Sequence, residues 1–376
     1  MKIVLIHKNK FHKRPPVISV VENLIKLGHT PCLITCGISE KYHKELTNRG
    51  IEVWIFSQKD NRKGLNVVHK LIEYYKFRKF VFSIIRKYIK QKIKILLWIE
   101  SAYTIVALGE AIKKYDYILQ IQELHEDSKL YLKAIGKVIH QAKVVFMPEY
   151  NRTVFYQIWF KLQQRPIVLP NKPYFIPSVT TIEQLKNKYQ DKIDVFQKKK
   201  VILYQGQIFH ERDLTNYIKA IKKLGEEYKL VLLGKDHFGT LKKYQKIDPE
   251  IIHIDFIPAP DYLLFTSCAY IGIVTYDPYE LNSAYCAPNK LYEYAAFSLP
   301  MLGNDVPGLK NIFEQNRIGI IVNENDESSI INGILEISNH IKYYKEQAQK
   351  FFDTVDNITI ISNILNKINN DNLKNN

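Results

Sequence analysis

A chain of 376 residues, 46% of them apolar, is long and apolar enough to form two domains that each bury a core. Its four cysteines, with no secretory signal peptide ahead of them, argue against a disulfide framework and for a reducing cytosol. The formal net charge of +16 lies entirely in the first half, because residues 1–175 carry 31 Lys/Arg against 13 Asp/Glu, and the remainder carries 23 against 25.

Strand and helix patterns alternate through the first half. Residues 2–7 read as a strand, residues 16–27 as a helix that ends at Gly28, and residues 31–36 as the next strand. Further strands are expected at 94–99, 117–121 and 144–147, a capped helix from Ser101 to Lys114, and another helix at 128–142. This repeated order predicts an α/β fold with parallel sheets and helices on both faces.

Residues 62–94 form an unusually basic stretch. Eleven Lys/Arg residues face one acid, Glu73, and aromatic and branched apolar residues lie between them at helical spacing. Such a helix suits the interface of an anionic membrane. The alternative is a solvated basic helix whose apolar side packs on its own domain. No uncharged run reaches the ~18 residues of a membrane-spanning helix, and no Cys/His cluster has zinc spacing, so no metal is expected.

A histidine follows the strand at 117–121. His125 stands at the carboxyl end of that strand, where open α/β sheets bind their ligands. The alternative is a satisfied structural histidine. Two prolines in residues 170–173 indicate a break between domains. We therefore expect a first domain of 1–170, a second domain of 171–352, and a final helix in 353–376 that returns to the first domain.

The second half contains a glycine turn followed by a cation. A strand at 201–204 leads to Gly206 and Gln207, and Arg212 precedes a helix at 213–224. Glycine lets backbone approach a ligand closely, and the forked donors of arginine suit a diphosphate. The alternative is an ordinary surface arginine.

A further helix begins near Pro288. Its first free N–H groups, at about Asn289 and Lys290, favour an anion such as a phosphate. Glu293, about one turn later, could accept hydrogen bonds from both hydroxyls of a ribose. An amphipathic helix with a surface glutamate is the alternative.

The run Pro-Asn-Lys-Leu-Tyr-Glu-Tyr-Ala-Ala from Pro288, followed by Leu-Pro, resembles the donor-site helix of retaining, family 4 type glycosyltransferases with the GT-B fold. The resemblance implies two Rossmann-like domains facing across a cleft. It further implies that Glu293 binds the ribose of a nucleotide sugar and that His125 reaches the sugar. The implied donor-binding residues also include Phe256 and Ile257, in a loop whose backbone reads the base, and Tyr276.

The chain departs from the family pattern at two positions. Tyr285 stands eight residues before Glu293, where the family usually has a second glutamate. Gln207 stands where an arginine usually follows the glycine, and Arg212 takes the place of the lysine five positions later. One positive charge is therefore missing, and Lys290 is a candidate to replace it.

Together these features predict a retaining glycosyltransferase at the cytoplasmic face of a membrane. It would use a nucleotide-sugar donor and no metal, and its acceptor would be a hydroxyl of a lipid-linked or cell-surface glycan. The catalytic residues would be His125, Arg212 and Glu293. A sugar-nucleotide epimerase or phosphorylase, and a non-catalytic scaffold or partner subunit, share the architecture. A nucleic-acid binder would explain the charge but would leave the donor motifs without a purpose, so no nucleic acid is expected as partner.

Overall fold

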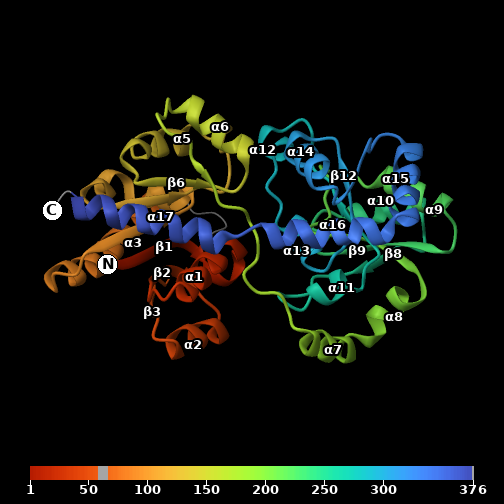
Figure 1. Ribbon diagram of the computed structural model, residues 1–376, viewed down its shortest axis with the longest axis horizontal. Helices are drawn as coiled ribbons and strands as arrows, with labels where there is room; N and C mark the ends of the chain where they lie inside the picture. Colours follow the sequence, from red (N-terminus) through yellow and green to blue (C-terminus); the bar gives the residue numbers. More distant parts are fainter. Residues whose placement is uncertain (58–66, 375–376) are drawn as a thin grey trace. The chain divides into compact units, whose positions relative to one another are not determined.

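The computed structural model describes residues 1–57 and 67–374, so positions 62–66 of the basic stretch lie outside the described residues. The chain divides into two units (Figure 1). The first unit comprises Met1–Tyr174 and Asp356–Asn376, and the second comprises Phe175–Val355. The expected boundaries at 171 and 353 therefore fall at 175 and 356. Each unit contains one parallel sheet with helices, so the predicted α/β class is confirmed.

The sheet of the first unit has seven strands in the order β3-β2-β1-β4-β5-β6-β7. All neighbours pair in parallel, and β1 lies between β2 and β4 with Ile6 opposite Ile34 and Ile99. These central strands are buried on both faces, which explains their continuous apolar sequence. The strands are β1 Lys2–Lys10, β2 Cys32–Gly37, β3 Glu52–Ile55, β4 Ile95–Glu100, β5 Tyr117–Gln120, β6 Val144–Met147 and β7 Ile167–Val168.

Helices cover this sheet, and the last helix of the chain is one of them. Ile361, Leu365 and Ile368 of that helix are buried in the same core as Val20 and Leu24. The helices are α1 Pro15–Lys26, α2 Glu40–Asn48, α3 Val67–Lys90, α4 Ala102–Leu108, α5 Lys129–Gly136, α6 Tyr150–Trp159 and α17 Asn357–Lys374, with short 3-10 turns η1 Phe11–Lys13, η2 Gly109–Lys114 and η3 Ile139–Gln141.

The sheet of the second unit has six parallel strands in the order β10-β9-β8-β11-β12-β13. The strands are β8 Lys200–Gln205, β9 Tyr228–Leu233, β10 Ile252–Ile254, β11 Ile271–Val274, β12 Met301–Asn304 and β13 Gly319–Val322. The helices are α7 Val179–Lys188, α8 Gln190–Lys198, α9 Thr215–Lys223, α10 Thr240–Ile247, α11 Leu263–Cys268, α12 Leu281–Ala284, α13 Asn289–Ala296, α14 Pro307–Asn316, α15 Glu327–Asn339 and α16 Ile341–Thr354. Because β8 and β11 are the two middle strands, their carboxyl ends form the centre of one edge of the sheet.

Several predicted element bounds were wrong. Strand β1 continues to Lys10, three residues past the expected end. Ser101 does not cap its helix: it has a φ of 74°, makes no capping hydrogen bond, and α4 stops at Leu108 before Gly109, whose φ is 61°. The helix expected at 128–142 is confined to Lys129–Gly136 and followed by the η3 turn.

Helix α3 changes character along its length. In its later turns Phe77, Val81, Ile84, Ile85 and Tyr88 are buried, so this half packs on its own unit. In its first turns Val68, Leu71, Ile72 and Tyr75 recur at helical spacing and are exposed, Leu71 at 60% and Tyr75 at 61%. The later half therefore matches the alternative of a basic helix packed on its own domain, and membrane contact by the first turns stays a prediction. In the part of the chain that the structure describes, every helix is too short or too polar to cross a bilayer.

Candidate active site

The last residue of β8 ties the sheet to α13. Gln205 is buried, and its amide nitrogen donates to Oε2 of Glu293 at 2.8 Å while its amide oxygen accepts from the Thr266 hydroxyl at 2.6 Å. The Tyr262 hydroxyl donates to the other carboxylate oxygen of Glu293 at 2.6 Å. Sequence reasoning missed Gln205 and Tyr262 as partners of Glu293; the only available signal for Gln205 was its place at a central strand end.

Glu293 is therefore a buried and oriented carboxylate rather than a surface one. Its exposed fraction is 6%, and burial raises its pKa, opposed by the hydrogen bond from Tyr262, the nearby Lys290 and the hydrogen bond from Gln205. Each carboxylate oxygen has two lone-pair directions, so one partner on each leaves an acceptor position free on both. A ribose diol would use these two remaining positions.

Lys290 lies one turn before Glu293 on the same helix. It is 7% exposed, and among the residues that the structure describes its Nζ finds no hydrogen-bond partner. The ammonium lies over the ring of Tyr204 at 4.6 Å and over that of Tyr276 at 5.8 Å. Burial first, and then Arg212, lower the pKa of Lys290 to about 7, against the opposing effects of Glu293 and Cys286.

Arg212 meets Lys290 at a shared aromatic ring. Its guanidinium carbon lies 4.3 Å from the centre of the Tyr276 ring, the same ring that Lys290 approaches. The backbone of Tyr276 is fixed by Asn304, whose side chain accepts from its N–H at 3.1 Å and donates to its carbonyl at 2.7 Å. Two cations, one from the loop after β8 and one from the first turn of α13, thus converge at the carboxyl ends of β8 and β11.

Two glycines lie beside this cluster, where the backbone passes close to neighbouring atoms. Gly206 has a φ of 150°, and a Cβ at that position would lie 3.5 Å from Nζ of Lys290. A Cβ on Gly308, in the first turn of α14, would lie 2.5 Å from the backbone nitrogen of Cys286. The close approach at Gly308 holds the loop that leads into α13, and only glycine permits it.

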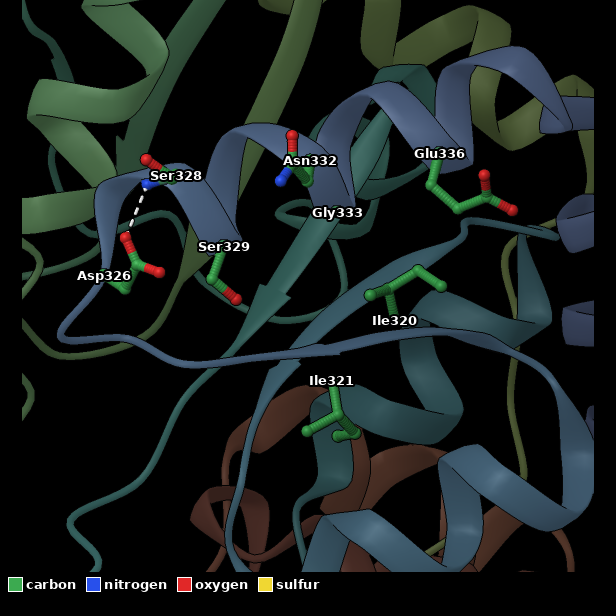
Figure 2. A pocket seen from close by; sticks show the side chains of 8 residues that line it. All are labelled: Ile320, Ile321, Asp326, Ser328, Ser329, Asn332, Gly333 and Glu336. Carbon is green, nitrogen blue, oxygen red and sulfur yellow. Dashed lines mark hydrogen bonds between the residues drawn. The ribbon is translucent and has the colours of Figure 1, made fainter.

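Two hollows on the second unit are both lined by carboxylates, and only one of them also has a Lys or Arg in its lining. One of about 280 Å³ includes Arg212 and Tyr276 in its lining, together with Thr275 and Glu324, whose hydroxyl and carboxylate are hydrogen-bonded at 2.9 Å. The other, of about 440 Å³, lies between β13 and α15 (Figure 2). Its lining carries the carboxylates of Asp326 and Glu336 and no Lys or Arg, so it does not suit a diphosphate.

The other expected donor residues lie around this cluster with less contact to it. Pro288 directly precedes the first residue of α13, Asn289, as its N-cap. Gln207 is exposed, and Tyr285 and Ile257 are half-buried. Phe256 is 65% exposed, beyond the carboxyl end of β10. The structure therefore brings together Gly206, Arg212, Tyr276, Lys290 and Glu293, and leaves the ring of Phe256 open to solvent.

His125 belongs to the first unit. It follows β5 in a left-handed conformation, with a φ of 60°, and its ring centre lies 4.9 Å from that of Tyr131. Burial lowers its pKa, with Glu123 acting in the opposite direction. A left-handed backbone is uncommon outside glycine, although histidine adopts it more often than most residues do.

Comparisons with known proteins concern the fold and the class of the chain. A family model described as glycosyl transferases group 1 matches residues 186–351, within the second unit. An uncharacterized glycosyltransferase of Haemophilus influenzae is 21% identical over 334 residues, covering 81% of this chain and 86% of that protein.

Solved structures share the fold over almost the whole chain. HepE of Anabaena, in complex with UDP and glucose, matches with a TM-score of 0.71 at 12% identity, covering 98% of this chain and 100% of that one. A glycosyltransferase from Rickettsia africae matches with a TM-score of 0.69 at 15% identity, covering 97% and 98%. The expected GT-B fold is thus confirmed. The chain therefore has the GT-B fold, and residues 186–351 of its second unit are similar to the glycosyl transferases group 1.

Proposed function

We propose that this enzyme transfers a sugar from a nucleoside diphosphate to a hydroxyl acceptor, with retention at the anomeric carbon. The convergence of Arg212 and Lys290 one helical turn from the oriented carboxylate of Glu293 carries the proposal. Cations suit the diphosphate, and a carboxylate suits the ribose beyond it. The complex of HepE with UDP and glucose supports this class of donor for a chain of the same fold.

The chemistry needs positive charge at the leaving group. Breaking the glycosidic bond leaves negative charge on the diphosphate, and fixed donors aimed there lower the barrier. Arg212, Lys290 and the first N–H groups of α13 would supply them, with His125 contacting the sugar. These protein cations make a metal ion unnecessary, so chelation with EDTA leaves transfer unchanged in this account.

The acceptor would be a lipid-linked or cell-surface glycan reached at the cytoplasmic face of a membrane. The exposed stripe formed by Val68, Leu71, Ile72 and Tyr75 on α3 supports this part of the proposal. Basic residues flank the stripe on the same helix, and Lys70, Lys76 and Lys79 are exposed. An apolar face with such flanks suits the headgroup region of an anionic bilayer.

A thermal-shift panel of UDP, GDP, dTDP and ADP tests the donor class. One of these nucleotides should raise the melting temperature, because ligand that binds only the folded state stabilises it by about 2.7 kcal/mol at a hundredfold excess over Kd. The nuclear magnetic resonance spectrum of the product formed from the matching nucleotide sugar then gives the anomeric configuration. No shift with any of the four would favour a non-catalytic scaffold, and an inverted product would contradict retention.

Vesicle flotation tests the membrane stripe. Replacing both Leu71 and Tyr75 by serine should weaken binding to phosphatidylglycerol vesicles about tenfold or more, since each buried apolar side chain contributes about 1.5–3 kcal/mol. Leu335→Ser, on an exposed apolar residue of the second unit, is the matched control and should bind like the unmodified protein. Equal binding to neutral phosphatidylcholine vesicles, or full binding by the double variant, would contradict the membrane assignment.

A further inference from the structure

Lys290 is buried, and the described residues around it do not satisfy the hydrogen-bonding capacity of its ammonium. Its Nζ has no acceptor among the described residues, although an ammonium carries three donors. The groups that face it are the rings of Tyr204 from β8 and Tyr276 beyond β11, the guanidinium of Arg212, Glu293 on its own helix, and Cys286 in the preceding loop. An isolated buried ammonium is costly, so these surroundings disfavour the protonated form of Lys290.

The two charged neighbours do not remove this cost. Arg212 remains protonated at any physiological pH, and as a like charge it disfavours a second cation beside the same ring. Glu293 has the opposite charge and favours the ammonium, but its effect on the pKa of Lys290 is smaller than that of burial and that of Arg212. An anion from outside the protein would therefore stabilise the ammonium form of Lys290.

We infer that Lys290 takes up a proton when a nucleoside diphosphate binds, so that the second cation of the donor site forms only in the occupied enzyme. This inference rests on the proposed function, because it requires the diphosphate to lie between Arg212 and Lys290. The phosphate oxygens supply the missing acceptors, and their charge outweighs the repulsion from Arg212. The proton comes from solvent and is returned when the diphosphate leaves.

The direction of the pH effect follows from the pKa of Lys290. In the empty site this pKa is lowered to about 7, mainly by burial, and the bound diphosphate raises it. Donor affinity is therefore greatest below pH 7. Above that value it falls by up to tenfold per pH unit, because one proton must be bound together with the nucleotide.

Calorimetry at pH 8 measures the proton directly. The probe is whichever of UDP, GDP, dTDP and ADP gives the largest thermal shift, titrated into the protein in HEPES and in Tris, whose ionisation enthalpies differ. At pH 8 the terminal phosphate of these nucleotides is already ionised, whereas Lys290 is mostly neutral. The dependence of the observed enthalpy on the buffer should correspond to uptake of close to one proton per nucleotide.

Three variants assign that proton to Lys290. Lys290→Met should bind without uptake and at least tenfold more weakly at pH 6.5. Lys290→Arg carries a permanent charge, so it should bind without uptake and with an affinity that is constant from pH 6.5 to 8.5. Lys198→Met removes a 68% exposed lysine of the same unit, which pairs with Asp194, and should retain the uptake of the unmodified protein.

The possible outcomes separate the two proposals. Tight binding of a nucleotide by the unmodified protein with no net proton uptake overturns the role of Lys290 and leaves the donor assignment standing. Full uptake by Lys290→Met also overturns it, since a group other than Lys290 would then bind the proton. No binding of any nucleotide overturns the proposed function itself, and this inference with it.

Discussion

Replacing Arg212 by alanine is expected to lower the rate of sugar transfer by about 10²–10³-fold, the usual effect of removing one donor from the site where negative charge develops. The loss should appear mainly in kcat, because charge on the diphosphate is greatest as the glycosidic bond breaks. The thermal shift caused by the nucleoside diphosphate should also disappear. Single-turnover kinetics with the matching nucleotide sugar measures the first effect.

Lys219→Ala is the matched control for this experiment. Lys219 lies on α9, close to Arg212 in the sequence, and pairs with Glu327 at 3.6 Å, so its loss removes a nearby cation that faces another helix. Such partly exposed ion pairs contribute little to stability, and this variant should melt and turn over like the unmodified protein. Near-normal kcat in Arg212→Ala would remove Arg212 from the reaction.

Replacing Glu293 by glutamine or by alanine should separate its effect on stability from its effect on nucleotide binding. Glutamine at this position can accept from Gln205 and donate to the oxygen of Tyr262, because a tyrosine hydroxyl can accept as well as donate. Glu293→Gln should therefore change the free energy of unfolding by less than about 1 kcal/mol. Losing the charged acceptor for the ribose hydroxyls should still weaken nucleotide binding about 10–100-fold.

Glu293→Ala removes the acceptor of the Gln205 amide and of the Tyr262 hydroxyl and should cost about 2–4 kcal/mol in the free energy of unfolding. Chemical denaturation measures the stability of both variants, and calorimetry with the nucleoside diphosphate measures their affinity. If Glu293→Gln binds nucleotide as tightly as the unmodified protein, then Glu293 only supports the fold around α13. The ribose contact would then have to be assigned to another group.

Much of the architecture was predictable because it depends on local pattern. Continuous apolar runs such as that of β4 are typical of strands buried on both faces, and the repeated strand–helix order leaves few topologies apart from parallel sheets. The predicted ends of helices were wrong where the backbone adopts a conformation that its residue type rarely prefers. Ser101, a common capping residue, adopts a φ of 74°, and no sequence rule identifies that position.

The site was predictable only in outline. The rule that ligands bind at carboxyl strand ends placed Gly206, Arg212 and Glu293 near one another, because their segments follow central strands or pack on them. Gln205 and Glu293 are 88 positions apart in the sequence, and their hydrogen bond depends on the orientation of α13 over β8. The shared ring of Tyr276 and the unpartnered Nζ of Lys290 likewise arise from packing, which residue spacing does not encode.

A crystal structure with the stabilising nucleoside diphosphate bound is the most direct test of the account. We expect phosphate oxygens within hydrogen-bond distance of both the Arg212 guanidinium and Nζ of Lys290, and the ribose hydroxyls at the free acceptor positions of Glu293. A nucleotide bound elsewhere on the second unit, with Lys290 still lacking an acceptor, would contradict the central claim.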